Sequence, residues 1–117
     1  MYTFGRVASA IPVAELERAL RFYRDILGFA VSFTNGDPVS FAVINQGGAQ
    51  LHLCVQPLKA GSSHAHLMVD DVNAVYEQLV REGATVRQAP KLQPWGLRDI
   101  VIADPDGNTF EIAESAG

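Results

Sequence analysis

The fold of this chain is decided by residues 63–83, which read SHAHLMVDDVNAVYEQLVREG. A short apolar stretch there leads into an amphipathic run that stops at Gly83. Residues 7–28, VASAIPVAELERALRFYRDILG, follow the same plan and stop at Gly28. Strand-like segments come after each run. Repetition of this length indicates one supersecondary unit used twice, so we expect two units that bury a shared core and enclose a site between them.

Each amphipathic run has the spacing of a helix. Apolar residues recur at i, i+3, i+4 and i+7, and charged side chains occupy the other face. Asp70 or Asp71 is a candidate N-cap of the second helix, and Gly28 and Gly83 are typical helix ends. The apolar positions are Leu16, Ala19, Leu20, Tyr23, Ile26 and Leu27 in the first run, and Val72, Val75, Tyr76, Leu79 and Val80 in the second.

Eight strands are expected, separated by turn-forming Gly, Pro, Asn and Asp residues. The order is βαβββ twice, in repeats of about 5–56 and 63–114 within a single domain of residues 1–117. This order predicts an α+β fold with helices outside an open mixed sheet. The expected strands are Val7–Val13, Phe29–Phe33, Val39–Ile44, Gln50–Val55, His64–Val69, Ala84–Gln88, Leu97–Ala103 and Thr109–Glu114.

The composition excludes several classes of function. A net charge of −4 with scattered basic residues argues against a nucleic-acid partner, which needs a clustered Lys/Arg surface. The chain has one cysteine, Cys54, and therefore no internal disulfide. No segment approaches the roughly 20 apolar residues of a membrane span. Without a signal-peptide pattern at the N-terminus, we expect a cytoplasmic location and no membrane partner.

Alternation along the strands predicts which side chains share a face, because successive residues point to opposite sides of a sheet. In residues 51–55 the leucines and the valine form one face, and His52 with Cys54 forms the other. The same alternation separates His64 from its apolar neighbours and places Glu111 with the polar set. We therefore expect His52, His64 and Glu111 to converge on the face away from the helices.

Four segments spread over nearly the whole chain carry a resemblance to a known family. They are residues 10–13, 19–29, 64–71 and 104–111, the last reading DPDGNTFE. Their sequences resemble the vicinal oxygen chelate superfamily, also called the glyoxalase/bleomycin resistance/dioxygenase fold. The resemblance implies a cup-shaped, eight-stranded mixed sheet built from paired βαβββ modules, with a cavity on the side away from the helices. Residues 104–108 are expected to form a hairpin turn and are assigned no chemistry.

Metal-dependent members of this superfamily place four potential ligands in the cup. By position, the resemblance assigns these to Ala8, His52, His64 and Glu111, of which Ala8 cannot coordinate a metal. Two imidazoles and a carboxylate suit Fe(II), Mn(II), Ni(II) or Zn(II). One alternative is therefore a metal-dependent lyase, isomerase or dioxygenase, with Glu111 also acting as the catalytic base.

The segment Gln93–Ile100, QPWGLRDI, resembles the Pro-Trp-Gly loop of bleomycin resistance proteins, which are metal-free. This favours a homodimer that binds an aromatic or oxygen-rich small molecule and confers antibiotic resistance by sequestration. Trp95 either stacks on that ligand or packs its loop at the sheet or a dimer interface. A third alternative is a non-catalytic dimerisation or regulatory module. The candidate ligand-binding residues are Trp95, Phe33, Phe41, His52, Cys54 and Arg98.

Overall fold

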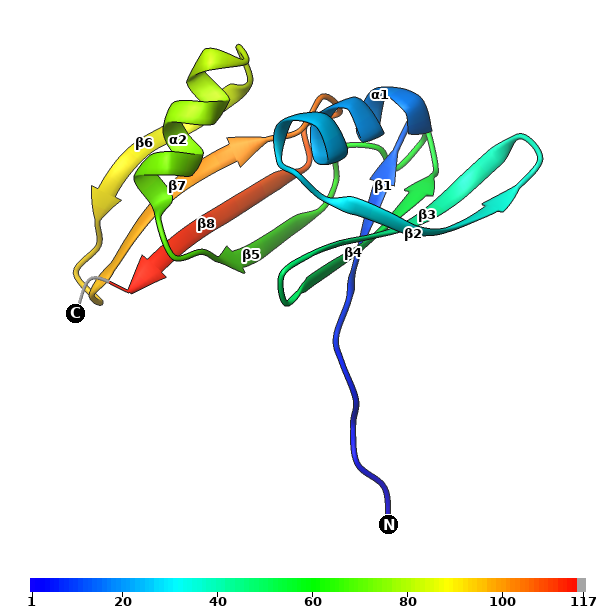
Figure 1. Ribbon diagram of the computed structural model, residues 1–117, viewed down its shortest axis with the longest axis horizontal. Helices are drawn as coiled ribbons and strands as arrows, with labels where there is room; N and C mark the ends of the chain where they lie inside the picture. Colours follow the sequence, from blue (N-terminus) through cyan, green and yellow to red (C-terminus); the bar gives the residue numbers. More distant parts are fainter. Residues whose placement is uncertain (116–117) are drawn as a thin grey trace.

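The computed structural model describes residues 1–115, and it contains two βαβββ modules (Figure 1). The α+β class and the repeated module predicted from the sequence are confirmed. The strands pair as two four-stranded mixed sheets. The first module consists of β1 (Ser9–Val13), α1 (Leu16–Leu20), η1 (Arg21–Ile26), β2 (Ala30–Gly36), β3 (Val39–Gln46) and β4 (Ala49–Val55). The second consists of β5 (His64–Met68), α2 (Val72–Arg81), β6 (Thr85–Leu92), β7 (Leu97–Ala103) and β8 (Thr109–Ser115).

Both sheets have the same topology. In the first sheet the strand order is β1-β4-β3-β2, and in the second it is β5-β8-β7-β6. The first strand of each module pairs in parallel with the last, and the other pairs are antiparallel. The helix α1 contacts β3 and β4, whereas α2 contacts β6, β7 and β8 (Figure 1). Each sheet therefore has one face covered by a helix and one face directed away from it.

The second helix begins as its sequence predicts. Of the two candidate caps, Asp71 is the N-cap, and its carboxylate accepts a hydrogen bond of 3.0 Å from Ala74 N. This bond satisfies one of the amide groups left free in the first turn. The chain leaves the helix through Gly83, whose φ of +70° favours a residue without a side chain.

The first helix differs from the continuous helix expected over residues 16–27. After Leu20 the backbone widens into the π-helical turn η1, in which Leu27 N donates to Phe22 O at 3.1 Å. The widened turn directs two adjacent aromatic side chains, Phe22 and Tyr23, into the core, where they are 4% and 0% exposed. A regular α-helix separates adjacent residues by about 100° and buries such a pair less easily.

Strand ends also differ from the sequence-based expectation. Strand β1 begins at Ser9, so Val7 and Ala8 lie outside the first sheet. Strand β6 continues to Leu92, four residues beyond the predicted end, because its register with β7 shifts twice and keeps the long hairpin paired. Alternation alone does not reveal such irregular pairing.

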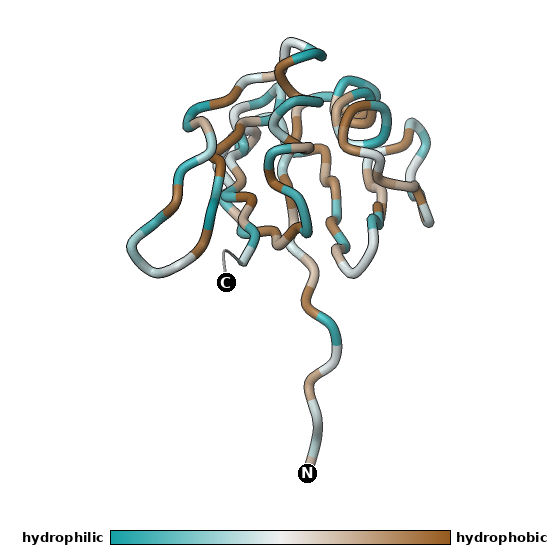
Figure 2. Tube along the Cα trace, turned by 60° about the vertical axis from the view of Figure 1, so that its left-hand side comes forward, coloured by the Kyte–Doolittle hydropathy of each residue, from teal (hydrophilic) through white to brown (hydrophobic). Residues whose placement is uncertain are grey.

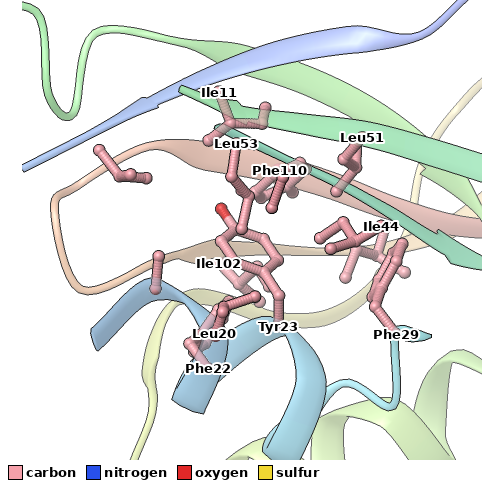
Figure 3. Packing of buried hydrophobic residues seen from close by; sticks show 14 of the residues in the cluster. Ile11, Leu20, Phe22, Tyr23, Phe29, Ile44, Leu51, Leu53, Ile102 and Phe110 are labelled. Atoms are coloured by element: carbon pink, nitrogen blue, oxygen red, sulfur yellow. The ribbon is translucent and has the colours of Figure 1, made fainter. Parts of the chain in front are cut away.

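The two modules share one core. Figure 3 shows side chains from both modules meeting around Tyr23 of η1. The ring of Tyr23 lies edge-to-face against Phe110 of β8, with 6.0 Å between ring centroids, and against Phe29 at 6.3 Å. Buried aromatic pairs of this kind contribute about 0.5–1.5 kcal/mol beyond area burial. The core therefore fixes the first helix against the second sheet.

A set of hydrogen bonds made by Asn108, termed here the polar joint, completes the contact between the modules. It is built on the β7–β8 turn, which was expected to be no more than a hairpin turn. Asn108 is fully buried there, and its Nδ2 donates to Pro12 O of β1 at 2.8 Å. Its Oδ1 accepts from Ser63 N and Ser63 Oγ at 3.1 and 2.9 Å. One side chain thus ties β1, the linker before β5 and the turn together.

The N-terminal segment, residues 1–8, extends away from both modules (Figures 1 and 2). Its large side chains are open to solvent, with Tyr2 77%, Phe4 87% and Val7 86% exposed. The rest of the described chain therefore does not bury the aromatic side chains of this segment.

Candidate functional site

The face of each sheet that lies opposite its helix is called here the open face. On the first sheet, register and alternation place Phe33, Phe41, His52 and Cys54 together on this face. Phe33 and Phe41 pack edge-to-face at 6.3 Å between ring centroids, and Phe41 packs against the His52 imidazole at 5.4 Å. Three predicted ligand-binding residues therefore form one continuous row of rings, termed here the aromatic row.

A chain of polar contacts runs beside the aromatic row and orients its histidine. His52 Nε2 lies 3.2 Å from Gln50 Oε1, and Gln50 Nε2 donates to Asn45 Oδ1 at 3.0 Å. Asn45 Nδ2 in turn donates to Ser32 Oγ at 2.7 Å. Because Gln50 Oε1 is an acceptor, this contact favours the tautomer of His52 that carries hydrogen on Nε2. The other ring nitrogen then remains an acceptor.

Cys54 lies on the same open face and is partly buried. Burial raises the pKa of its thiol above the ordinary value, which disfavours the thiolate. Its Sγ lies 3.7 Å from the backbone oxygen of His52. Cys54 is thus placed as a neutral wall residue of the candidate site.

The open face of the second sheet carries a different set of groups. Glu111 of β8 has 19% of its side chain exposed, and its Oε2 lies 3.7 Å from His66 Nδ1 on β5. His64 contacts Thr109 instead, with 2.7 Å between Nδ1 and Oγ1, and its ring packs edge-to-face on His66 at 5.1 Å. The nearest imidazole to Glu111 among these contacts belongs to His66, not to the predicted ligand His64.

The most buried charged group of this face is Asp99, which sequence reasoning did not select. It is 2% exposed, and its Oδ1 accepts hydrogen bonds from Gln88 Nε2 at 2.7 Å and Gln93 Nε2 at 3.0 Å. Although burial acts to raise the pKa of Asp99, the bonds from Gln93, Gln88 and Glu111 and the charge of Lys91 hold it below the ordinary value. The only sequence signal was a charged residue, next to Arg98, in the otherwise apolar segment Leu97–Ala103.

The predicted metal ligands do not meet within one chain. His52 belongs to the first sheet, whereas His64 and Glu111 belong to the second. Among residues 1–115, no three His, Cys, Asp or Glu side chains are grouped closely enough to hold a metal ion. The donor set of a single chain therefore does not fit a divalent metal, and the proposed ligand set remains a prediction.

Two further predicted residues lie away from the aromatic row. Arg98 stands opposite Glu114 in the β7–β8 register and alternates with Asp99, so it shares the helix-covered side with Ile100. Trp95 lies in the turn between β6 and β7 and is 64% exposed. Gly96, which follows it, has a φ of +94°, a conformation that glycine adopts without strain.

A groove of about 630 Å³ lies between the modules. It is bounded by the β3–β4 turn, the start of β2, the strand β5 and the start of α2, and none of the predicted ligand or metal residues lines it. The lining residues are Leu27, Phe29, Gln46, Gly47, Gly48, Ala49, His66, Leu67, Met68, Val69, Asp70, Val75 and Ile112. The aromatic row thus lies on an open sheet face, outside this groove.

None of the helices within residues 1–115 has the length and apolarity needed to cross a membrane.

Comparison with known proteins gives consistent matches. The sequence family described as "Glyoxalase/Bleomycin resistance protein/Dioxygenase superfamily" matches residues 3–112. The antibiotic-binding protein TnmS3 from Streptomyces sp. CB03234 is 30% identical, with 98% of this chain and 99% of that chain covered and a TM-score of 0.85. A bleomycin-binding protein complexed with bleomycin has a TM-score of 0.80 at 22% identity, covering 96% and 99% of the two chains, a likeness of fold. The lactoylglutathione lyase of Haemophilus influenzae is 27% identical over 88% of this chain and 87% of its own.

Proposed function

This chain belongs to the Glyoxalase/Bleomycin resistance protein/Dioxygenase superfamily, and on that premise we propose that it binds an aromatic small molecule without converting it. The proposed role is sequestration of an antibiotic or another planar compound. Two observations support a binding role over chemistry: the gathering of aromatic rings on one open face, and the separation of the candidate metal ligands within the chain. The similarity to the antibiotic-binding protein TnmS3 points the same way.

The aromatic row carries the proposal. Phe33 is 54% exposed although it lies within a strand, and Phe41 and His52 are partly buried beside it. A planar ligand on these rings gains about 0.5–1.5 kcal/mol per aromatic pair beyond the area that it buries. The polar chain from His52 to Ser32 supplies donors and acceptors for oxygen atoms on the ligand. The result is the mixture of apolar surface and few polar groups that small-molecule sites share.

A second copy of the chain is part of this proposal. Small-molecule sites commonly bury about 70–90% of the ligand, which one open sheet face does not achieve. A homodimer that places the open face of one copy over that of another encloses the ligand on both sides. The exposed aromatic side chains of the N-terminal segment, residues 1–8, give such a dimer further apolar surface to bury. We expect this dimer in the cytoplasm.

Isothermal titration calorimetry with planar antibiotics tests the proposal. Metal-free bleomycin and doxorubicin serve as probes, and at least one is expected to bind with a dissociation constant in the micromolar range or below. Phe41→Ala should weaken that binding about five- to tenfold, which corresponds to the stacking energy of one ring. Leu58→Ala, at a fully exposed apolar residue outside the sheets, is the control and should leave affinity unchanged. If neither probe binds, or if Phe41→Ala binds as well as the wild type, the proposed site is wrong.

The similarity to a lactoylglutathione lyase favours one second candidate, a metal-dependent enzyme. It requires His52 of one copy to meet His64 and Glu111 of another. Elemental analysis after incubation with Fe(II), Mn(II), Ni(II) or Zn(II) and desalting distinguishes the two functions. About one equivalent of metal per chain, lost in His52→Ala and retained in Leu58→Ala, would support the enzyme.

A further inference from the structure

The polar chain of the first sheet runs in one direction, and a backbone carbonyl sets that direction. Ser32 Oγ donates to Val43 O at 3.3 Å, and a carbonyl oxygen can only accept. Because its hydrogen is used there, Ser32 Oγ accepts from Asn45 Nδ2 at 2.7 Å. The Asn45 oxygen is thereby turned towards Gln50 Nε2, and the Gln50 oxygen towards His52. His52 Nε2, 3.2 Å from that oxygen, is therefore the ring nitrogen that carries hydrogen.

Strand pairing brings the members of this polar chain side by side. Asn45 stands opposite Gln50 in the β3–β4 register, and Gln50 precedes His52 by two residues on the same face of β4. The β2–β3 register shifts at Ser32, and this bulge releases Ser32 from strict alternation. The direction of the polar chain thus depends on contacts among three strands.

The other ring nitrogen of His52, Nδ1, is an acceptor that the described chain leaves without a donor. Within residues 1–115 no group forms a hydrogen bond with it, and it is not one of the buried atoms that lack a partner, so it is open to solvent. The residues paired with His52 are Ala10 of β1 and Val43 of β3, whose side chains carry no donor. The Cys54 thiol donates to the backbone oxygen of His52 instead of the ring. An oriented acceptor beside the aromatic row is therefore available to a ligand.

We propose that His52 Nδ1 accepts a hydrogen bond from an O–H or N–H group at the edge of the planar ligand, and that Gln50 is the positioning residue for this bond. The inference rests on the proposed binding function and adds one feature to the ligand, a neutral donor on or next to its aromatic ring. A ring in contact with Phe41 has the imidazole as its neighbour, since the two centroids are 5.4 Å apart. A tautomer fixed in advance lowers the cost of ordering the site on binding.

A divalent metal would compete for the same lone pair, because neutral imidazole nitrogens coordinate metals. Among residues 1–115, no three His, Cys, Asp or Glu side chains are grouped to hold a metal ion. The binding measurements are therefore made with EDTA and repeated without it. A preference for donor-bearing ligands that is present without EDTA and absent with it would assign the lone pair to a metal and overturn the inference.

The test compares two isomers, 3-methylindole and 1-methylindole, by NMR titration of the full chain at pH 7.5. Both have the same atoms and the same fused ring, but only 3-methylindole keeps the ring N–H. We expect it to bind about three- to tenfold more tightly, the ratio that corresponds to one hydrogen bond. His52→Phe keeps a ring and removes the acceptor, and it should bring the two affinities together. Leu58→Phe, which adds a ring at a fully exposed position outside the sheets, should preserve the preference.

Gln50→Lys tests the positioning role and keeps the test decisive if His52→Phe does not fold. The ammonium group donates where the amide oxygen accepted, so the imidazole should carry its hydrogen on Nδ1 and lose the preference. Long-range ¹H–¹⁵N correlation spectra identify the protonated ring nitrogen, which should be Nε2 in the wild type and Nδ1 in Gln50→Lys. Gln56→Lys adds the same charge at an exposed residue after β4 and should change neither property.

Three results would overturn the inference. They are equal affinities or no binding of either isomer to the wild type at 2 mM, a preference that survives in His52→Phe, and a Gln50→Lys variant that keeps the wild-type tautomer and preference. The proposed function fails separately, through the loss of Phe41-dependent binding of planar antibiotics. If Phe41→Ala weakens that binding while the two isomers bind equally, the function stands and the requirement for a donor is wrong.

Discussion

Tyr23 Oη donates a 2.7 Å hydrogen bond to Asp104 Oδ2, and this bond joins the two modules across 81 residues of sequence. Both side chains are buried, at 0% and 4% exposure. Burial, together with the charge of Asp104, raises the pKa of Tyr23 far above its ordinary value, which favours the protonated phenol that donates this bond. The first helix is thereby fixed to the β7–β8 turn, and the two open faces keep a defined relative orientation.

Tyr23→Phe removes that donor and keeps the ring. We expect the free energy of unfolding to fall by about 1–2 kcal/mol, because Asp104 Oδ2 retains only its bond from Asn108 Nδ2. Urea denaturation measures the change. Tyr76→Phe is the matched control, since the Tyr76 hydroxyl forms no hydrogen bond within residues 1–115, and it should stay within about 0.5 kcal/mol of the wild type. Equal stability of the two variants would mean that the bond contributes nothing.

Asn108→Asp replaces a donor by an acceptor at the joint. The new carboxylate oxygen faces Pro12 O and Asp104 Oδ2, both of which accept hydrogen bonds from the amide. A loss of about 3–5 kcal/mol is expected at pH 7, because a charge is left buried without a partner. The same change at Asn73, which is exposed in the first turn of α2, should not destabilise the chain. Thermal unfolding followed by circular dichroism compares the two, and a small loss for Asn108→Asp would contradict the assigned geometry.

Gly61→Ala introduces a methyl group where the linker between the modules touches the β7–β8 turn. A Cβ at Gly61 would clash with the backbone oxygen of Asp106, and φ there is +85°. Gly28 has a similar φ of +81° with open space around it. Both alanine variants therefore lose about 1–2 kcal/mol to backbone strain, but Gly61→Ala should lose about 1–3 kcal/mol more from overpacking. Denaturant midpoints that coincide for the two variants would show that the linker moves freely away from the turn.

Asp99 gives stability a defined pH dependence. Its pKa in the folded chain lies below the ordinary value of 3.8, so the carboxylate form stabilises the fold above that value. The contribution is lost as pH falls through the folded pKa. We expect the difference in free energy of unfolding between wild type and Asp99→Asn to be constant from pH 7 to about 5 and to shrink below about pH 4. Asp37→Asn, which removes one exposed carboxylate from the β2–β3 turn, is the control for the loss of one negative charge. A difference that grows on acidification would reverse the sign and contradict the assignment.

The helices and faces followed from the spacing of residues. The period of 3.6 located α2 and narrowed its cap to Asp70 or Asp71, and alternation placed His52 and Cys54 on one face of β4. These features depend on neighbours within a few residues, which the sequence displays directly. The same reasoning did not locate the π-helical turn at Phe22 and Tyr23, because that turn depends on core packing against β8.

The burial of Asp99 could not be predicted from the sequence at all. Sequence analysis did not single out Asp99, which follows the charged Arg98 in β7. Its burial depends on amides contributed by Gln88 and Gln93 from a neighbouring strand and turn. The two shifts of register in that hairpin decide which amides reach it, and no local pattern encodes them.

The sequence by itself determined the α+β class, the duplicated βαβββ module and the faces of the regular strand segments at residues 51–55, 64–69 and 110–112, because periodicity fixes side-chain direction within a regular element. The tertiary structure alone decided that His52 is separated from His64 and Glu111, that the turn at residues 104–108 joins the modules, and that Asp99 is buried. These outcomes depend on how two separately paired sheets are oriented by contacts between residues far apart in the chain, for which the spacing of residues carries no signal.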